Sequence, residues 1–158
     1  MTRDIAHKLV CKNHPLDGKP ALIHSKFFPP LQGAKRKMSS SDSNSAIFLT
    51  DSGDDIERKI KEHAFSGGQE SKQLQEKFWA NLDLDVSYQW LRFFLDDDEE
   101  LEKIGNEYSS GSGEFWSTAK VKTRFIQILK QVVGDHQLRR AKVTDEIVYK
   151  WMLERSIL

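Results

Sequence analysis

The chain has 158 residues, which is enough for one domain, or for the end of one domain followed by a second small one. Its 24 Lys and Arg residues balance its 24 Asp and Glu residues, so any basic surface for nucleic acid must be local. A single cysteine excludes an intramolecular disulfide, and neither a membrane-spanning run nor a secretory signal is visible, which together predict a cytoplasmic protein without a membrane partner.

The first fifty residues mix one helical pattern with two short apolar runs. Thr2 can cap a helix that places Ile5 and Leu9 at helical spacing, and a helix starting so early predicts that the chain is part of something longer. The runs "ALIHS" (21–25) and "AIFLT" (46–50) predict two short buried strands. One helix and two strands are the edge of an α/β domain rather than a whole domain.

From Asp51 onward the pattern is helical. Helices are predicted after a cap at Asp51, over "SKQLQEKFWANL" (71–82), after Asp85, over "DDDEELEKIGNEY" (96–108) with an end near Gly111, from Thr118, and after Thr144. The helix after Asp85 is apolar nearly all round, which predicts the central helix of a bundle. The sequence therefore predicts a mainly α fold: a short α/β remnant followed by an α-helical bundle.

The two C-terminal helices each carry a predicted buried face. In the longer one, an apolar stripe is formed by Val121, Phe125, Ile128, Leu129, Val132 and Val133. In the last one, the corresponding face is formed by Ile147, Val148, Trp151 and Met152. Trp90, Phe93 and Phe94 lie at helical spacing and are also expected in the core rather than as stacking residues.

A basic, hydroxyl-rich segment separates the two predicted strands. Three basic residues at 35–37 come just before three serines at 39–41, a combination suited to polyphosphate binding. A solvated linker or a phosphorylated segment is the alternative. The flanking "FFPPLQG" and "AIFLTD" weigh against that alternative, because linkers seldom sit between buried strands.

The string "KMSSS" (37–41) resembles the KMSKS signature of class I aminoacyl-tRNA synthetases, with Ser40 in the place of a lysine. Together with "HSKFFPPLQG", "KEHAFSGG", "DVSYQWLRFFLDDD" and "VTDEIV", it is similar to the C-terminal portion of the eukaryotic-type tryptophanyl-tRNA synthetases. The resemblance implies that residues 1–50 are the end of a Rossmann-like catalytic domain with the KMSKS-type loop. Residues 51–158 would then be an α-helical anticodon-binding domain.

The resemblance also implies an activity and its partners. Members activate tryptophan with ATP, taken as its Mg²⁺ complex, to tryptophanyl-adenylate and transfer it to tryptophan tRNA, and they act as homodimers. The chain contains no H-x-G-H element, and most of the tryptophan pocket would precede it. We therefore expect the parent protein to be a tryptophan–tRNA ligase and the isolated chain to be inactive, with its own oligomeric state open.

Individual residues follow from the same resemblance. Lys37 is expected on the pyrophosphate oxygens as the catalytic cation, and the ATP-binding residues would be Lys37, Met38, Ser39, Ser40 and Ser41. In the anticodon-binding part the candidates are Gly68, Gln69 and Glu70, where a carboxylate at Glu70 can accept a cytosine amino group. Related enzymes tend to carry Arg-Asp at the last two positions, which puts base reading by Gln69 in doubt.

Four lysines have two possible roles, and the five histidines are not expected to bind a metal. Lys59, Lys61, Lys72 and Lys77 are RNA-phosphate contacts or a solvated helix face. The histidines lack ligand spacing, so no structural metal is expected. The competing interpretation of the whole chain is a helical RNA-binding or protein-interaction module without catalytic function.

Overall fold

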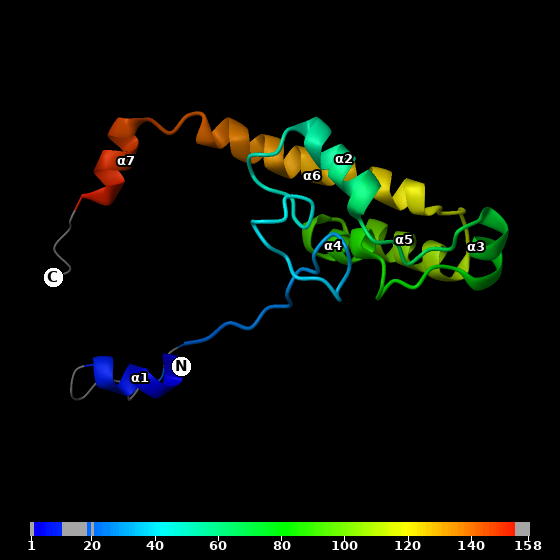
Figure 1. The fold of residues 1–158 in the computed structure, drawn as a ribbon, viewed down its shortest axis with the longest axis horizontal. Coiled ribbons are helices and arrows are strands. Elements are labelled where there is room, and N and C mark those ends of the chain that lie inside the picture. Colours follow the sequence, from blue (N-terminus) through cyan, green and yellow to red (C-terminus); the bar gives the residue numbers. More distant parts are fainter. Residues whose placement is uncertain (1, 11–18, 20, 154–158) are drawn as a thin grey trace.

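The computed structural model describes residues 2–10, 19 and 21–153, and within them every regular element is a helix (Figure 1). The helices are α1 (Thr2–Leu9), α2 (Gly53–His63), α3 (Lys72–Phe78), α4 (Val86–Phe94), α5 (Asp98–Ser110), α6 (Thr118–Arg140) and α7 (Asp145–Met152). The predicted mainly α fold is confirmed. None of the described helices is long and apolar enough to cross a membrane.

The bundle is built around α6 rather than around the helix after Asp85. Helices α2 and α4 both pack on α6, and α5 packs on α4 (Figure 1). Although α4 is the more apolar helix, it has only 9 residues, whereas the 23 residues of α6 are long enough to support both neighbours. Glu57 of α2 also pairs with Lys130 of α6 at 2.5 Å, and this hydrogen bond is the main cause that lowers the pKa of Glu57 to about 2.

Most predicted helix starts are confirmed, with one shift. Asp85 caps α4 and Thr144 caps α7. At α2 the cap is Ser52 rather than Asp51: the Ser52 hydroxyl accepts from the backbone N–H of Asp55, whose carboxylate accepts from the N–H of Ser52. The Asp51 carboxylate instead accepts hydrogen bonds from Lys59 and from the backbone N–H of Phe48.

The two predicted strands do not form in the described residues. Residues 21–25 run as an exposed extended segment, with Ile23 95% exposed, and residues 46–50 are irregular with a turn at 49–50. A strand draws its hydrogen bonds from a neighbouring strand. No segment lies alongside residues 21–25 to supply them in the part of the chain that the structure describes, so the apolar pattern alone does not produce a sheet.

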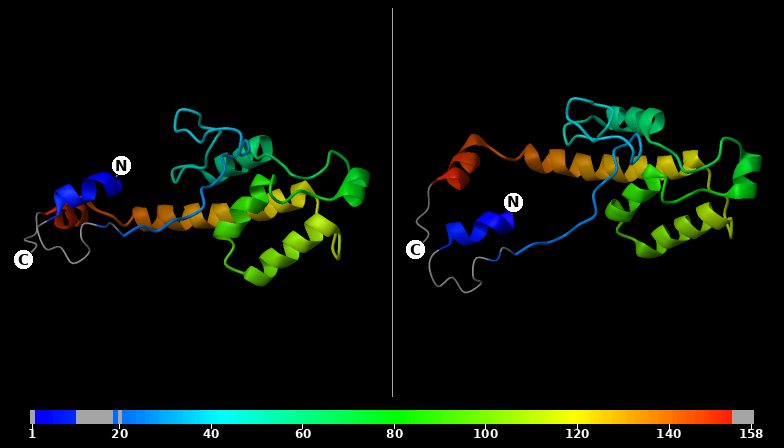
Figure 2. Two further views of the ribbon diagram at one scale, coloured as in Figure 1. Left: turned by 90° about the horizontal axis from the view of Figure 1, so that it is seen from below. Right: turned by 60° about the horizontal axis from the view of Figure 1, so that its bottom comes forward.

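The stripe on α6 is confirmed, and the stripe on α7 is not. Val121, Phe125, Ile128, Leu129 and Val133 are buried in the core, and Val132 is half-buried against it. On α7 the four residues of the predicted buried face are 41–78% exposed, because this helix lies beyond the end of the bundle (Figures 1 and 2). Helix α1 also lies away from the bundle in all views.

A relay of backbone hydrogen bonds ties the basic loop to the bundle. The N–H of Leu31, which is fully buried, donates to the carbonyl of Ser45 at 2.9 Å. The carbonyl of Leu31 accepts from Phe65 at 2.7 Å, and the carbonyl of Phe65 accepts from Val86 at 3.1 Å. The loop, the turn after α2 and the start of α4 are thus joined, while a domain division at residue 50 remains a prediction.

Candidate functional site

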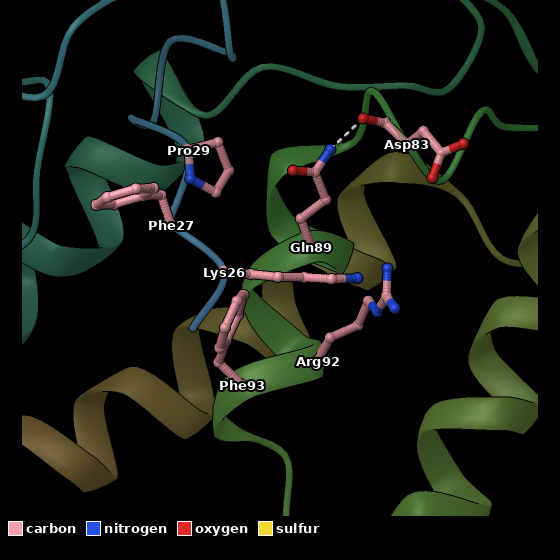
Figure 3. A pocket seen from close by; sticks show the side chains of 7 residues that line it. All are labelled: Lys26, Phe27, Pro29, Asp83, Gln89, Arg92 and Phe93. Atoms are coloured by element: carbon pink, nitrogen blue, oxygen red, sulfur yellow. Dashed lines mark hydrogen bonds between the residues drawn. The ribbon is translucent and has the colours of Figure 1, made fainter. Parts of the chain in front are cut away.

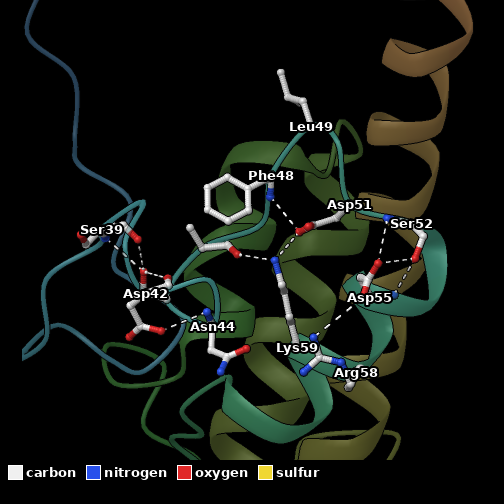
Figure 4. A network of polar contacts seen from close by, with 12 residues as sticks. Ser39, Asp42, Asn44, Phe48, Leu49, Asp51, Ser52, Asp55, Arg58 and Lys59 are labelled. Carbon is white, nitrogen blue, oxygen red and sulfur yellow. Dashed lines mark hydrogen bonds and ion pairs between the residues drawn. The ribbon is translucent and has the colours of Figure 1, made fainter.

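The basic loop is closed around one buried hydroxyl, that of Ser45. This side chain is fully buried and shares its proton between the carbonyls of Ser39 at 3.0 Å and Asp42 at 2.7 Å. Its oxygen in turn accepts from the backbone N–H of Ser39 at 3.0 Å. These contacts hold the residues before and after 40 as one compact turn (Figure 4). The sequence gives no signal that singles out Ser45 among the many serines of this loop.

The residues of the KMSSS loop (37–41) are accessible on that turn. Lys37, Ser40 and Ser41 are exposed, and Met38 is 37% exposed. The hydroxyls of Ser39 and Ser41 lie 2.8 Å apart, so the structure brings these two predicted donors together. Within the described residues Lys37 forms neither a hydrogen bond nor an ion pair, which leaves its ammonium available to an anion.

Behind the loop, Lys59 is committed to the fold. It is only 3% exposed, and its ammonium donates to the Asp51 carboxylate at 2.6 Å and to the Ala46 carbonyl at 3.3 Å (Figure 4). Asp51 also accepts from the N–H of Phe48 at 2.9 Å. Both alternatives for Lys59, an RNA-phosphate contact and a solvated helix face, are therefore wrong. The sequence could have indicated this burial, because Lys59 lies next to Ile60 on the edge of the buried stripe of α2.

The turn between α2 and α3 is held by a buried carboxylate, that of Asp85. Its Oδ2 accepts from the Gly67 N–H at 3.0 Å and from the Tyr108 hydroxyl at 3.0 Å, while Oδ1 accepts from Tyr88 N–H at 2.9 Å. Asp85 is 1% exposed and Tyr108 is fully buried. A buried carboxylate needs such donors to offset its lost hydration, so this network fixes the position of the glycine turn.

The three predicted anticodon residues have different environments. A Cβ at Gly68 would lie 2.3 Å from the Thr118 hydroxyl, so the site requires glycine. Gln69 is tied back, because its side-chain amide donates to the Trp79 carbonyl at 2.9 Å. Glu70 is exposed and forms no ion pair in the described part of the chain. Of the three, Glu70 presents a free carboxylate, and Gln69 keeps only its side-chain Oε1 without a hydrogen bond among the described residues.

A pocket of about 310 Å³, here called the turn pocket, opens beside these residues. It is lined by Gln69, Glu70, Ser71, Lys72, Gln75, Phe115, Ser117, Thr118 and Ala119. The Lys72 ammonium lies 5.3 Å from the centre of the Phe115 ring. A ring, a cation and a free carboxylate around one hollow can hold an unpaired nucleobase by stacking and edge hydrogen bonds.

Two residues of the turn pocket were missed by the sequence reasoning. Phe115 lies in an irregular segment without periodicity, and Gln75 resembles any polar residue of a solvated helix. The structure buries Gln75 to 3% exposure, where its Oε1 accepts from the Gln69 N–H at 2.7 Å. Its Nε2 has no partner among the described residues. Only the tertiary contacts of α3 reveal either residue.

The buried network makes stability sensitive to alkaline pH. Burial, followed by the charge of Asp85, raises the pKa of Tyr108 to about 12. The folded state therefore favours the neutral phenol, whose contribution is complete below pH 10 and is lost as the pH rises toward 12. We expect the free energy of unfolding to fall by roughly 2 kcal/mol across this interval. Urea unfolding at pH 8, 10, 11 and 12 measures it.

The matched variant for this prediction is Tyr108→Phe. It keeps the ring and removes the titrating hydroxyl, so we expect it to be less stable at pH 8 by about 1–2 kcal/mol but to lose less stability above pH 10. Burial also raises the pKa of Tyr88, which leaves a smaller alkaline slope in the variant. Equal slopes in the two proteins would contradict the assignment to Tyr108.

No group of three or more His, Cys, Asp or Glu side chains within residues 2–10, 19 and 21–153 is arranged to hold an ion. The acidic run at 96–100 instead begins α5, with Asp97 as its cap and three acidic residues in the first turn.

The loop, the turn and the helical bundle together place the chain in a family. The pattern of the tRNA synthetases class I (W and Y) matches residues 1–130, which is most of the chain. The chain therefore belongs to this class I tRNA synthetase family.

Within that family, the relatives compared are tryptophan enzymes. The cytoplasmic tryptophan–tRNA ligase of Homo sapiens is 46% identical over 157 residues, which cover 99% of this chain and 31% of that protein. The Arabidopsis thaliana counterpart is 47% identical, with 99% and 37% covered. The solved tryptophanyl-tRNA synthetase of Giardia lamblia superposes with a TM-score of 0.81 at 38% identity, over 97% of this chain and 36% of that one. The chain thus spans about a third of the length of these relatives.

Proposed function

We propose that the chain is the C-terminal portion of a cytoplasmic tryptophan–tRNA ligase. It would supply the ATP loop and the surface that reads the anticodon of tryptophan tRNA. The observation that carries the proposal is the identity of 46% to a tryptophan–tRNA ligase along 99% of the chain. The complete protein would join tryptophan to its tRNA with ATP and Mg²⁺ as substrates, and would act as a homodimer.

For the ATP loop, the geometry supports a role for Lys37 in charge neutralisation. Activation of an amino acid by in-line attack on the α-phosphorus builds negative charge on the leaving pyrophosphate. An exposed lysine without an internal partner can follow that charge as the loop closes. The paired hydroxyls of Ser39 and Ser41 would donate to further phosphate oxygens, while Met38 would contact the adenine and Ser40 would add only a hydroxyl.

For the tRNA, the turn pocket supports recognition of one unpaired base. The free carboxylate of Glu70 can accept from an exocyclic amino group, such as that of cytosine. The Phe115 ring offers a stacking face, and Lys72 offers a cation for the neighbouring phosphate. Gln69 would act only as an acceptor, because its side-chain amide nitrogen already donates to Trp79 and its backbone N–H to Gln75, and Gly68 would act through its lack of a side chain.

Substitution of Glu70 tests the reading of the anticodon. We expect Glu70→Gln to weaken binding of tryptophan tRNA by the chain by roughly five- to 150-fold, since a carboxylate acceptor is lost. Fluorescence titration with the tRNA transcript measures the change. The matched control is Glu102→Gln on the exposed side of α5, which removes the same charge. The two variants would bind alike if Glu70 had no part in base recognition.

Two further measurements separate the proposal from its alternative, a non-catalytic RNA-binding or protein-interaction module. The chain by itself should give no tryptophan-dependent exchange of pyrophosphate into ATP, whereas a longer chain that includes an H-x-G-H element should give it. An upstream sequence without such an element would favour the non-catalytic module. Failure of the chain to bind any tRNA across a series of salt concentrations would favour a protein-interaction module.

A further inference from the structure

A second pocket, separate from the loop and from the turn pocket, lies where the extended segment 26–29 crosses α4 (Figure 3). Its volume is about 280 Å³, and its lining residues are Lys26, Phe27, Pro29, Asp83, Gln89, Arg92 and Phe93. We call it the crossing pocket. It shares no residue with the turn pocket, so it does not depend on the function proposed above.

The crossing segment is anchored by Phe28. The Phe28 ring lies 4.4 Å from the Phe93 ring and 5.4 Å from the Phe94 ring, centre to centre. Next to it, the Trp90 indole N–H donates to the Pro29 carbonyl at 2.9 Å. These contacts fix the path of the backbone. In an extended chain alternate side chains point to the same side, so Lys26 is directed toward α4 together with Phe28.

Two cations meet in the crossing pocket. Lys26 and Arg92 both line this pocket, and in Figure 3 the Lys26 ammonium and the Arg92 guanidinium point toward each other; Arg92 follows Gln89 by one turn of α4. Asp83 lines the same pocket, but neither cation forms an ion pair with it or with another carboxylate in the described residues. Like charges placed together repel each other, and an anion bound between them removes that repulsion.

An exposed aromatic ring, that of Phe93, lies beside these cations in the same pocket. Phe93 is 41% exposed, although it was expected in the core. The Phe27 ring is 97% exposed but points to the other side of the segment (Figure 3). Arginine binds phosphate through its planar fork and lysine through a point charge. An exposed ring at the same place offers a face on which a base can stack. A cation pair beside an open ring matches a phosphate that carries a nucleoside better than it matches a bare anion.

We propose that the crossing pocket binds a nucleotide phosphate. Lys26 and Arg92 hold the phosphate oxygens, and Phe93 stacks on the attached base. The ligand is either a nucleotide within a single-stranded RNA or a free mononucleotide, since both present the same phosphate and base. With a volume near 280 Å³ the pocket accommodates one phosphate and its nucleoside at most.

The test is a fluorescence titration of the 158-residue chain with a labelled seven-nucleotide oligouridylate at low salt. We expect the double variant Lys26→Ala/Arg92→Ala to bind about tenfold or more weakly, with a salt slope reduced by about 1.4 because two phosphate contacts on a single strand are lost. We expect Phe93→Ala to bind roughly five- to 150-fold more weakly. The substituted side chains are exposed, so thermal melting should show wild-type folding.

The matched control is Arg139→Ala/Lys142→Ala, which removes the same two charges from exposed positions near the end of α6. Displacement of the oligouridylate by adenosine monophosphate would identify a free nucleotide as the ligand, and lack of displacement would identify an RNA strand. Either result supports the proposal if the Lys26/Arg92 variant is the weaker binder. Equal binding by this variant and the control would overturn it. So would a Phe93 variant that binds normally while inorganic phosphate displaces the RNA as well as the mononucleotide does.

Discussion

Replacement of Lys37 by alanine, in the complete enzyme to which we assign this chain, is expected to lower the rate of ATP–pyrophosphate exchange by about 10²–10³-fold. The ammonium of Lys37 is exposed and forms no ion pair with the described residues, so its loss should leave the fold intact. The effect should fall on the chemical step, because the charge on the leaving pyrophosphate develops in the transition state.

Two measurements separate this role from a general charge effect. Tryptophan binding, measured without ATP, should stay near the wild-type value, because Lys37 is assigned to the phosphates. Lys142→Ala, which removes an equally exposed lysine near the end of α6, should leave the exchange rate unchanged. An exchange rate within a few-fold of wild type for the Lys37 variant would exclude a catalytic role for this residue.

The second large effect is expected at Gly67, on stability. A Cβ at this position would lie 2.0 Å from the Asn81 carbonyl oxygen and 2.8 Å from the backbone nitrogen of Asp85. Both neighbours are backbone atoms and cannot rotate away, so the turn itself has to open. We expect Gly67→Ala to lower the free energy of unfolding by roughly 3 kcal/mol or more, as urea unfolding would measure.

Gly134 supplies the matched control for Gly67. It lies inside α6, and a Cβ built there meets nothing within 4 Å. Because alanine has the higher helix propensity, Gly134→Ala should raise the free energy of unfolding by about 1 kcal/mol. The same substitution thus has opposite signs at the two sites. A Gly67→Ala protein as stable as wild type would show that the turn is not held by the Asp85 network.

The glycine turn also shows how stability and the proposed recognition are connected. Gly67 and Gly68 are positioned by Asp85 and Tyr108, and the next residues along the chain line the turn pocket. A variant that loosens this network should therefore weaken tRNA binding as well as stability. The sequence marks the two glycines as a break between helices, but it does not show what holds the break in place.

Local patterns in the sequence were sufficient for most of the helices. Caps at Asp85 and Thr144, and the glycine that ends α5, are signals carried by one to four neighbouring residues. The α6 stripe repeats often enough to identify the buried face without any partner. The loop at 37–41 was also visible, because its residue types follow one another directly in the chain.

The predictions that were wrong share one physical cause. Each concerned a residue or segment whose burial depends on contacts with another segment of the chain. Residues 21–25 have the apolar content of a strand but no neighbouring strand in the described residues, and α7 has an apolar face beyond the end of the bundle. Lys59 looked like a solvated cation, yet Asp51 and the Ala46 carbonyl bury it. Apolar content and charge are properties of a residue, whereas burial is a property of its surroundings.

The sequence by itself determined the helical class, the caps of α4 and α7, the KMSSS loop and the family, because each of these is encoded in contiguous residues or in one helical period. Only the tertiary structure decided that α6 is the central helix, that Asp85 holds the glycine turn, and that Phe115 and Gln75 join Glu70 in one pocket. It also brought Lys26 to Arg92 across α4. Such contacts join residues far apart in the chain, and their geometry is set by the packing of whole helices.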